Sequence, residues 1–184
     1  GTEVTAGTNS VAVDTTAPSI SGIAITATDS SDNAKTDTLV EGDKIVATVT
    51  LDDNGAVVSG TDATLDIDVG GTTRQASLTD ATDGVLTFEY TVASDDTDDA
   101  DGITVASDAI TLNNTTVADA AGNAADLSGT EVTAGTNSVA VDTTAPTFTV
   151  GTLASDNAND ITLATVGDTV TVTFTTDGTE DGTP

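Results

Sequence analysis

The sequence contains no histidine, cysteine, methionine or tryptophan. Because imidazole and thiolate groups are missing, the chain can form neither a Ser–His–Asp triad nor a cysteine nucleophile, and it cannot build a tetrahedral zinc or iron–sulfur site. General acid–base chemistry would fall to carboxylates alone. Carboxylate pairs do hydrolyse glycosides, but normally among aromatic sugar platforms, and the chain has only one tyrosine and three phenylalanines. We therefore expect a protein that is not an enzyme.

Basic residues are also scarce: 3 lysines and arginines stand against 31 acids, which gives a formal net charge of −28. A nucleic-acid-binding surface must be basic to displace counterions from phosphates, so the charge excludes nucleic acid as a partner. The same charge disfavours anionic membrane surfaces. No apolar run is long enough to span a bilayer, so we expect no direct membrane insertion of this segment.

The acidic excess must be neutralised for compact folding, since like charges repel over a Debye length of roughly 8–10 Å. Without cysteine no disulfide can stiffen the fold, so another kind of stabilising interaction is needed. Bound divalent cations or very high salt would both serve. Disorder is the alternative, because high net charge is part of its signature. Against it, 36% of the residues are hydrophobic, and they are strongly patterned.

An internal repeat organises the chain. Residues 1–18 and residues 129–146 are identical, and both read GTEVTAGTNSVAVDTTAP. A weaker similarity continues beyond this block, where Gly42–Val49 matches Gly167–Phe174. An identical run of this length does not arise by chance, so the chain is part of an array of near-copies.

Apolar and hydroxyl side chains alternate along several short stretches, which is the period of a half-buried antiparallel strand. The clearest stretches are Ile45–Leu51, Leu65–Val69, Leu86–Val92 and Val170–Phe174, with shorter ones at Ile23–Ile25, Ile103–Val105 and Val139–Val141. Between them lie clusters of Gly, Asn and Asp that favour turns, such as Gly70-Gly71 and Asp83-Gly84. Only the segment 106–110 suggests a helical turn. The pattern predicts an all-β fold, an antiparallel sandwich of two sheets.

The repeat also sets the expected domain boundaries. Residues 18–145 form one complete module, residues 1–17 are the last strand of a preceding module, and residues 146–184 are the N-terminal part of a following one. Pro146 fixes its own φ and pushes Ala145 towards extended geometry, so the joint is not floppy. A sandwich start without its final strand exposes sheet edges. Three interpretations stay open: a window on a longer fibre, chains that lend the strand to one another by β-augmentation, or plain truncation.

The motif VDTTAP at 13–18 and 141–146, together with Asp119-Ala120-Ala121-Gly122-Asn123, resembles the immunoglobulin-like repeats of bacterial surface proteins. Such repeats occur in the giant repeats-in-toxin adhesins of Gram-negative bacteria. The resemblance covers nearly the whole chain and implies immunoglobulin-like antiparallel β-sandwich modules in tandem. It also implies an extracellular stalk at the cell surface, and calcium at turns and between modules.

Calcium takes six to eight hard oxygen ligands, and three acid-dense regions could supply them. The first lies at the joints, where Asp14 and Asp142 precede Thr-Thr-Ala-Pro. The resemblance places the Asp119–Asn123 turn near the same end of the module, so Asp119 and Asn123 could complete this site. The plain structural alternative is that Asp142 caps a turn and that the Asp119–Asn123 segment is a tight hairpin.

The second region is Asp95–Gly102, where acids at Asp96, Asp99 and Asp101 repel one another unless a cation lies among them. It mimics the opening of an EF-hand loop, but its flanks are expected to be strands. The third region holds Asp29, Asp32 and Asp37, and acids recur in the later copy. For both regions the alternative is a solvated acidic loop.

The function we expect is mechanical: a calcium-stiffened extender or stalk module of an adhesin or fibre, joined head to tail with neighbouring identical modules. A subunit of a self-assembling filament or surface layer, joined by interchain strand exchange, is the first alternative. A carbohydrate-binding module is the second, although no aromatic platform is evident. Halophilic solvation without a specific metal is the third.

Overall fold

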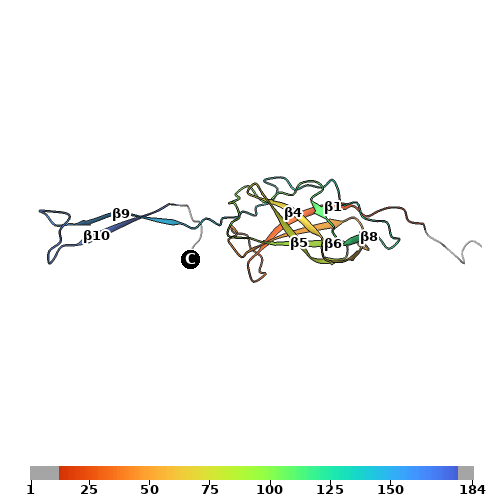
Figure 1. The fold of residues 1–184 in the computed structure, drawn as a ribbon, viewed down its shortest axis with the longest axis horizontal. Helices are drawn as coiled ribbons and strands as arrows, with labels where there is room; N and C mark the ends of the chain where they lie inside the picture. Colours follow the sequence, from red (N-terminus) through yellow and green to blue (C-terminus); the bar gives the residue numbers. More distant parts are fainter. Residues whose placement is uncertain (1–12, 178–184) are drawn as a thin grey trace, which may run out of the picture. The chain divides into compact units, whose positions relative to one another are not determined.

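The computed structural model describes residues 13–177, and the strand expected at 1–17 therefore lies largely outside the described residues. The described residues contain strands and no helix, so none of them forms a helix long and apolar enough to cross a membrane. The chain divides into two compact units at Thr143/Thr144, within the expected joint (Figure 1). The strands are β1 (Ile20–Thr28), β2 (Lys44–Leu51), β3 (Val57–Ser59), β4 (Thr64–Val69), β5 (Thr72–Thr82), β6 (Val85–Thr91), β7 (Ile110–Thr111), β8 (Thr116–Ala118), β9 (Thr147–Ser155) and β10 (Val170–Asp177).

A curled six-stranded antiparallel sheet forms the body of the first unit, in the order β1-β2-β6-β5-β4-β7 (Figure 1). Two of its hairpins use the turns that the sequence predicts. Gly70 and Gly71 join β4 to β5 with φ of 56° and 84°, and Asp83 and Gly84 join β5 to β6 with φ of 52° and 76°. Positive φ at both central residues is the hairpin turn whose twist matches that of the flanking strands.

The core lies on one face of this sheet. Along β2, Ile45, Ala47, Val49 and Leu51 are buried, as the alternation predicts. The layer that covers them is mostly irregular. It includes Val117 of β8, which pairs with β3 in a separate two-stranded sheet, and buried residues outside named strands: Leu39, Ile103, Val105, Val132 and Val141. The all-β prediction is confirmed, whereas the second sheet is reduced to two short strands and isolated bridges.

The segment 129–142 supplies the last extended piece of the first unit. Val132 and Val105 exchange two backbone hydrogen bonds of 2.8 and 2.9 Å. Val141 forms bridges on both sides, parallel to Leu39 and antiparallel to Asp99. Here the repeated sequence is hydrogen-bonded to two neighbours at once, although it forms bridges rather than a continuous strand.

The helical turn expected at 106–110 is not found. Asp108 has a φ of 61°, which a right-handed helix does not accommodate, and β7 begins at Ile110. Asp108 instead accepts a hydrogen bond at Oδ1 from the Gly129 N–H at 3.1 Å. The segment therefore turns between extended pieces.

The second unit, over its described residues, is the hairpin of β9 and β10. Val172 pairs with Leu153, as Ala47 pairs with Ile25 in the first unit. Each hairpin also carries one register irregularity. The apolar side chains of the second hairpin are exposed: Phe148 by 72%, Val150 by 64%, Leu153 by 70% and Phe174 by 65%. The same strand pairing thus occurs in both units, but its apolar side chains are buried in the first unit and exposed in the second.

Candidate metal sites

The Asp119–Asn123 turn follows β8 and closes on itself. Oδ1 of Asp119 accepts the backbone N–H of Asn123 at 2.8 Å, and Oδ2 accepts its side-chain amide at 2.7 Å. The hydrogen bond from the Asn123 side chain is the main reason why the pKa of Asp119 lies below its usual range. Asp119 is buried, and these hydrogen bonds favour its ionised form.

The Asn123 amide also reaches the residues that precede the module. Its Nδ2 atom donates to the backbone carbonyl of Asp14 at 3.2 Å, while the Asp14 carboxylate accepts the N–H of Thr16 at 3.0 Å. A carboxylate of Asp119 and a carbonyl of Asp14 therefore converge on one amide group. Carboxylate, amide and carbonyl oxygens are the ligands that calcium prefers, and Asp14, Asp119 and Asn123 carry oxygens of these kinds. In this structure the Asn123 side-chain N–H group occupies the point between the Asp119 and Asp14 oxygens, so a bound cation would have to displace it.

Asp142 is not brought to this place. Its N–H donates to the carbonyl of Leu39 at 2.9 Å, next to the bridge between Val141 and Asp99. Asp14 and Asp142 occupy equivalent positions of the repeat, but only Asp14 meets an Asp119–Asn123 turn in the described chain.

In the second region, Asp95–Gly102, the side chains of Asp96 and Asp99 turn inward. The Asp96 carboxylate accepts the Tyr90 hydroxyl at 3.0 Å and the Ala93 N–H at 2.8 Å. Nε of Arg74 lies 2.6 Å from Oδ1 of Asp96, an ion pair that lacks hydrogen-bond geometry at Nε. The Asp96 side chain is fully buried. Its charge is met by an arginine, a phenol and a backbone amide, so this residue does not fit a calcium ligand.

Asp99 is likewise engaged by backbone donors. Oδ1 accepts the N–H groups of Asp101 and Gly102 at 2.9 and 3.0 Å, and Oδ2 accepts that of Gly70 at 3.0 Å. Asp101 itself is exposed, and its carbonyl accepts the N–H of Gly135 at 2.8 Å. The repulsion expected in this loop is relieved by donors of the protein, and these contacts give the predicted calcium site no support.

In the third region the carboxylates serve separate partners. Asp29 accepts the N–H groups of Ser31 and Asn33, and the Asn33 side chain is the main cause that lowers the pKa of Asp29. Asp32 forms an ion pair with Lys44. Asp37 is reached by the Thr36 hydroxyl at 3.4 Å. A turn cap, a salt bridge and a weak hydroxyl contact do not make one cation site.

Within residues 13–177, no three histidine, cysteine, aspartate or glutamate side chains gather to hold a metal. The Asp14–Asp119–Asn123 set is of another kind, because its hydrogen-bonded atoms belong to the Asp119 carboxylate, the Asp14 backbone carbonyl and the Asn123 amide. Of the residues singled out by sequence as joint ligands, Asp14, Asp119 and Asn123 meet through hydrogen bonds from the Asn123 side-chain nitrogen.

A turn-capping aspartate that recurs in both units, buried as Asp43 and half-buried as Asp168, was missed. Oδ2 of Asp43 accepts the Val40 N–H at 2.9 Å and lies 2.6 Å from Nζ of Lys35. Oδ2 of Asp168 accepts the Thr165 N–H at 2.8 Å and the Asn157 amide at 2.9 Å. The signal was present, because both aspartates follow a glycine in the matching blocks. They cap the turn before the second strand of each hairpin.

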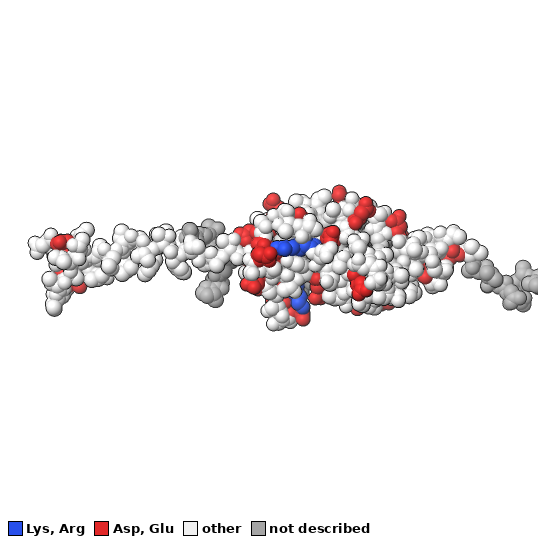
Figure 2. All heavy atoms as spheres, in the orientation of Figure 1, with Lys and Arg blue, Asp and Glu red and all other residues white. Residues whose placement is uncertain are grey.

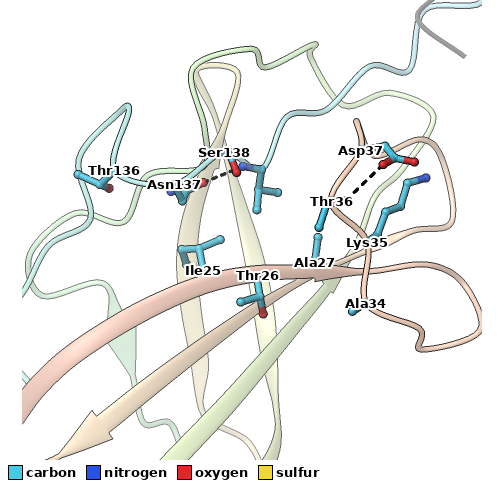
Figure 3. A pocket seen from close by; sticks show the side chains of 11 residues that line it. Ile25, Thr26, Ala27, Ala34, Lys35, Thr36, Asp37, Thr136, Asn137 and Ser138 are labelled. Carbon is cyan, nitrogen blue, oxygen red and sulfur yellow. Dashed lines mark hydrogen bonds between the residues drawn. The ribbon is translucent and has the colours of Figure 1, made fainter.

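A groove of about 390 Å³ lies between β1 and the segment 136–139 (Figure 3). Ile25, Ala27 and Val139 line it, and Asn137 turns its Oδ1 back to the Val139 N–H at 3.2 Å. Lys35 at its rim pairs with Asp43.

Acidic atoms are scattered over the visible face of the first unit, and basic atoms lie beside them (Figure 2). Each of the three basic residues of the sequence, Lys35, Lys44 and Arg74, forms an ion pair with an aspartate.

Comparison of the chain with protein-family models, with curated proteins and with solved structures finds no match.

Proposed function

We propose that this chain is a non-enzymatic spacer from an extracellular bacterial adhesin or fibre, made of immunoglobulin-like β-sandwich modules in tandem. One observation carries the proposal: residues 129–142 provide the last extended segment of the first unit and lead directly into a second hairpin paired like β1 and β2. Because residues 1–18 have the same sequence, we infer that they end a preceding module. Chained modules of one kind form a spacer, as in other repeat proteins.

The charge distribution supports this role. All three basic residues are used in internal ion pairs, and the other charged side chains are acidic. The partners that we propose are neighbouring modules of the same kind, at the cell surface, rather than nucleic acid or lipid. Display of the chain on intact cells would be tested by antibody labelling with and without permeabilisation. Labelling only after permeabilisation would rule out the surface location.

Calcium is part of the proposal at one place, the contact between Asp14 and the Asp119–Asn123 turn. Asp119 would supply a carboxylate, Asn123 its amide oxygen and Asp14 its carbonyl or carboxylate, with water for the remaining positions. Bound calcium supplies positive charge where negative groups of successive modules meet. For Asp142 the corresponding turn would belong to the following module. The calcium predictions at Asp29, Asp32, Asp37, Asp96, Asp99 and Asp101 find no support in the contacts of these side chains.

The test compares the full chain in calcium and in chelator. We expect calcium to raise the melting temperature measured by circular dichroism and to narrow the distribution of conformers measured by small-angle scattering. Asp119→Asn should abolish the calcium-dependent shift, whereas Glu41→Gln, which removes one exposed charge, should retain it. Equal melting in calcium and chelator would refute the calcium claim. Full stability in chelator with concentrated potassium chloride would favour halophilic solvation instead.

The open face of the second hairpin favours one alternative, a filament subunit that receives a strand from a neighbouring copy. Phe148, Leu153 and Phe174 are exposed there, whereas the equivalent hairpin of the first unit is covered. Residues 1–17 of a second copy carry the sequence that helps cover the first unit. Sedimentation at rising concentration tests this. Assembly that disappears on deletion of residues 1–16 would support the filament, and a monomer at every concentration would rule it out.

A further inference from the structure

The loop Ala93–Gly102, here called the acidic loop, holds the residues through which the chain leaves the first unit. Thr143 donates its N–H to Oδ1 of Asp98 at 2.9 Å and its hydroxyl to the carbonyl of Asp96 at 2.7 Å. Two residues earlier, Val141 and Asp99 exchange backbone hydrogen bonds of 2.7 and 2.8 Å. The exit residues Val141–Thr143 are thus attached to this loop at four points.

The same loop is fastened to the hairpin of β4 and β5. The Asp99 carboxylate accepts the N–H of Gly70, and Gly70 packs so closely that a Cβ there would lie 2.7 Å from the carbonyls of Thr97 and Asp98. The hydroxyls of Thr72 and Thr97 are 3.3 Å apart. The loop therefore connects the exit residues with the six-stranded sheet.

Arg74 of β5 is the strongest link in this connection. It forms the buried ion pair with Asp96, and its Nη2 atom donates to the Asp95 carbonyl at 3.1 Å and lies 3.4 Å from the Asp95 carboxylate. Its guanidinium thus joins two consecutive residues of the loop at a carboxylate and a carbonyl. A planar fork with several donors suits this task, and a lysine ammonium does not reproduce it.

We propose that Arg74 and the acidic loop form a mechanical clamp that transmits tension from Thr143 into the six-stranded sheet without a metal ion. The clamp gives the spacer of the proposed function a second, calcium-independent source of strength. On one side of Val141, Leu39 is hydrogen-bonded to the neighbouring residues Ala140 and Asp142, and on the other side Val141 itself is hydrogen-bonded to Asp99. Because ladder hydrogen bonds run across the strands, a pull along residues 139–143 strains the bonds on both sides together.

The clamp accounts for the acidity of the loop in structural terms. Asp96 and Asp99 use their charges to accept hydrogen bonds that order the loop, and Asp98 accepts one from Thr143. If Arg74 is removed, Asp96 keeps a buried carboxylate without its cation, and such loss of one partner is strongly destabilising. The loop should then detach together with the exit residues.

Single-molecule pulling on the full chain tests the clamp. The sequence has no cysteine, so Thr15→Cys and Ala145→Cys give two unique handles that flank the first unit. The test variant is Arg74→Met and the matched control is Lys44→Met. The two wild-type side chains are exposed by 23% and 24%, and each lies within ion-pair distance of two acids.

All pulling is done in chelator, so that a failure of the calcium site cannot be confused with a failure of the clamp. At a fixed force we expect Arg74→Met to unfold roughly ten-fold faster than wild type, which corresponds to about 1.4 kcal/mol, and Lys44→Met to stay within about two-fold. Equal acceleration by the two variants would overturn the clamp. Calcium-dependent melting that persists in Arg74→Met would leave the spacer proposal intact.

A second variant keeps the test decisive if Arg74→Met does not fold. Thr143→Val removes the hydroxyl that donates to Asp96 and leaves the buried ion pair in place. We expect it to accelerate unfolding under force and to speed hydrogen exchange at the amides of Asp99 and Thr143, with an unchanged melting temperature. Wild-type exchange and wild-type unfolding rates in Thr143→Val would contradict the proposal.

Discussion

The hydroxyl group of Tyr90 lies 3.0 Å from both carboxylate oxygens of Asp96. Tyr90 is on β6 and Asp96 is in the acidic loop, so the contact ties the loop to the centre of the sheet. Burial, and then the hydrogen bond and charge of Asp96, raise the pKa of Tyr90 to about 12. The phenol must stay neutral to donate, because a phenolate would face a carboxylate.

The first prediction concerns alkaline pH. The folded-state pKa of Tyr90 is raised above the ordinary value near 10, so its stabilising contribution is complete below about pH 10 and is lost as the pH rises towards 12. The chain has one tyrosine and no tryptophan, so the ultraviolet absorbance of tyrosinate reports this residue alone. The midpoint should lie near 12 in the folded chain and near 10 in urea.

Asp96→Asn is the companion variant for this titration. It removes the negative charge and retains an oxygen acceptor, so the Tyr90 midpoint should fall towards its ordinary value. Glu41→Gln, which removes an exposed charge elsewhere, should leave the midpoint unchanged. An ordinary midpoint in the folded wild type would show that Tyr90 and Asp96 are not in contact.

The second prediction separates two glycines with similar backbone angles. Gly102 has a φ of 92°, and a Cβ there would lie 2.6 Å from the carbonyl oxygen of Asn137. Gly122 has a φ of 94° and nothing within 4 Å of that position. Gly122→Ala should cost about 1–2 kcal/mol in unfolding free energy from the backbone conformation alone. Gly102→Ala should cost distinctly more, because the segment 129–142 must move.

Urea unfolding of both glycine variants checks this difference. The comparison also probes whether residue 137 packs against the turn at Asp101-Gly102 in solution. Equal destabilisation by the two variants would mean that the repeated segment does not lie where the structure places it. That outcome would also weaken the argument that this segment ends the module.

The third prediction contrasts two equivalent side chains of the hairpins. Ile25 pairs with Ala47 and is 9% exposed, and Leu153 pairs with Val172 and is 70% exposed. Ile25→Ala should lower the unfolding free energy of the first unit by about 2–5 kcal/mol, since it removes core volume. Leu153→Ala should leave that transition unchanged, within about 0.5 kcal/mol.

Thermal melting and sedimentation of both variants give the readout. If Leu153→Ala weakens a concentration-dependent assembly without altering the first transition, the filament alternative gains support. If it destabilises the first unit as much as Ile25→Ala does, the side chain of Leu153 is not open to solvent. The division of the chain into two units would then be wrong.

Periodicity predicted the strongest strands because burial and spacing agree there. The alternation at Ile45–Leu51 and Leu86–Val92 became β2 and β6, and the Gly70-Gly71 and Asp83-Gly84 turns formed as expected. β5 was missed, because only Ala76 and Leu78 are buried along its length and its outward residues are polar. The covering layer was overestimated, since segments held by single bridges show the same short alternation as strands.

Acid density says little about the surroundings of each carboxylate, and the metal sites stay predictions. It cannot show whether a carboxylate faces a cation, a backbone amide or an arginine, and here Asp96 and Asp99 face donors of the protein. Arg74 stands far from both in sequence, so their contact depends on how β5 and the acidic loop fold together. The Asp119–Asn123 turn was easier, because an aspartate and an asparagine four residues apart often bond each other's backbone.

The last prediction concerns acid. The pKa of Asp119 is lowered, chiefly by the Asn123 side chain, so the ionised form is the one that the fold stabilises. Its contribution is therefore present above the unfolded value of about 3.9 and disappears as the pH falls through the lower folded value. In chelator, the wild type should lose stability as the pH drops below about 4, and Asp119→Asn should lose less over that range while being less stable at neutral pH. Urea unfolding over a pH series measures both effects, with Glu41→Gln as the charge-matched control. If Asp119→Asn and Glu41→Gln show the same pH dependence, the Asp119 carboxylate is not held by the turn, and the oxygen set that Asp14, Asp119 and Asn123 would offer to calcium is not preformed.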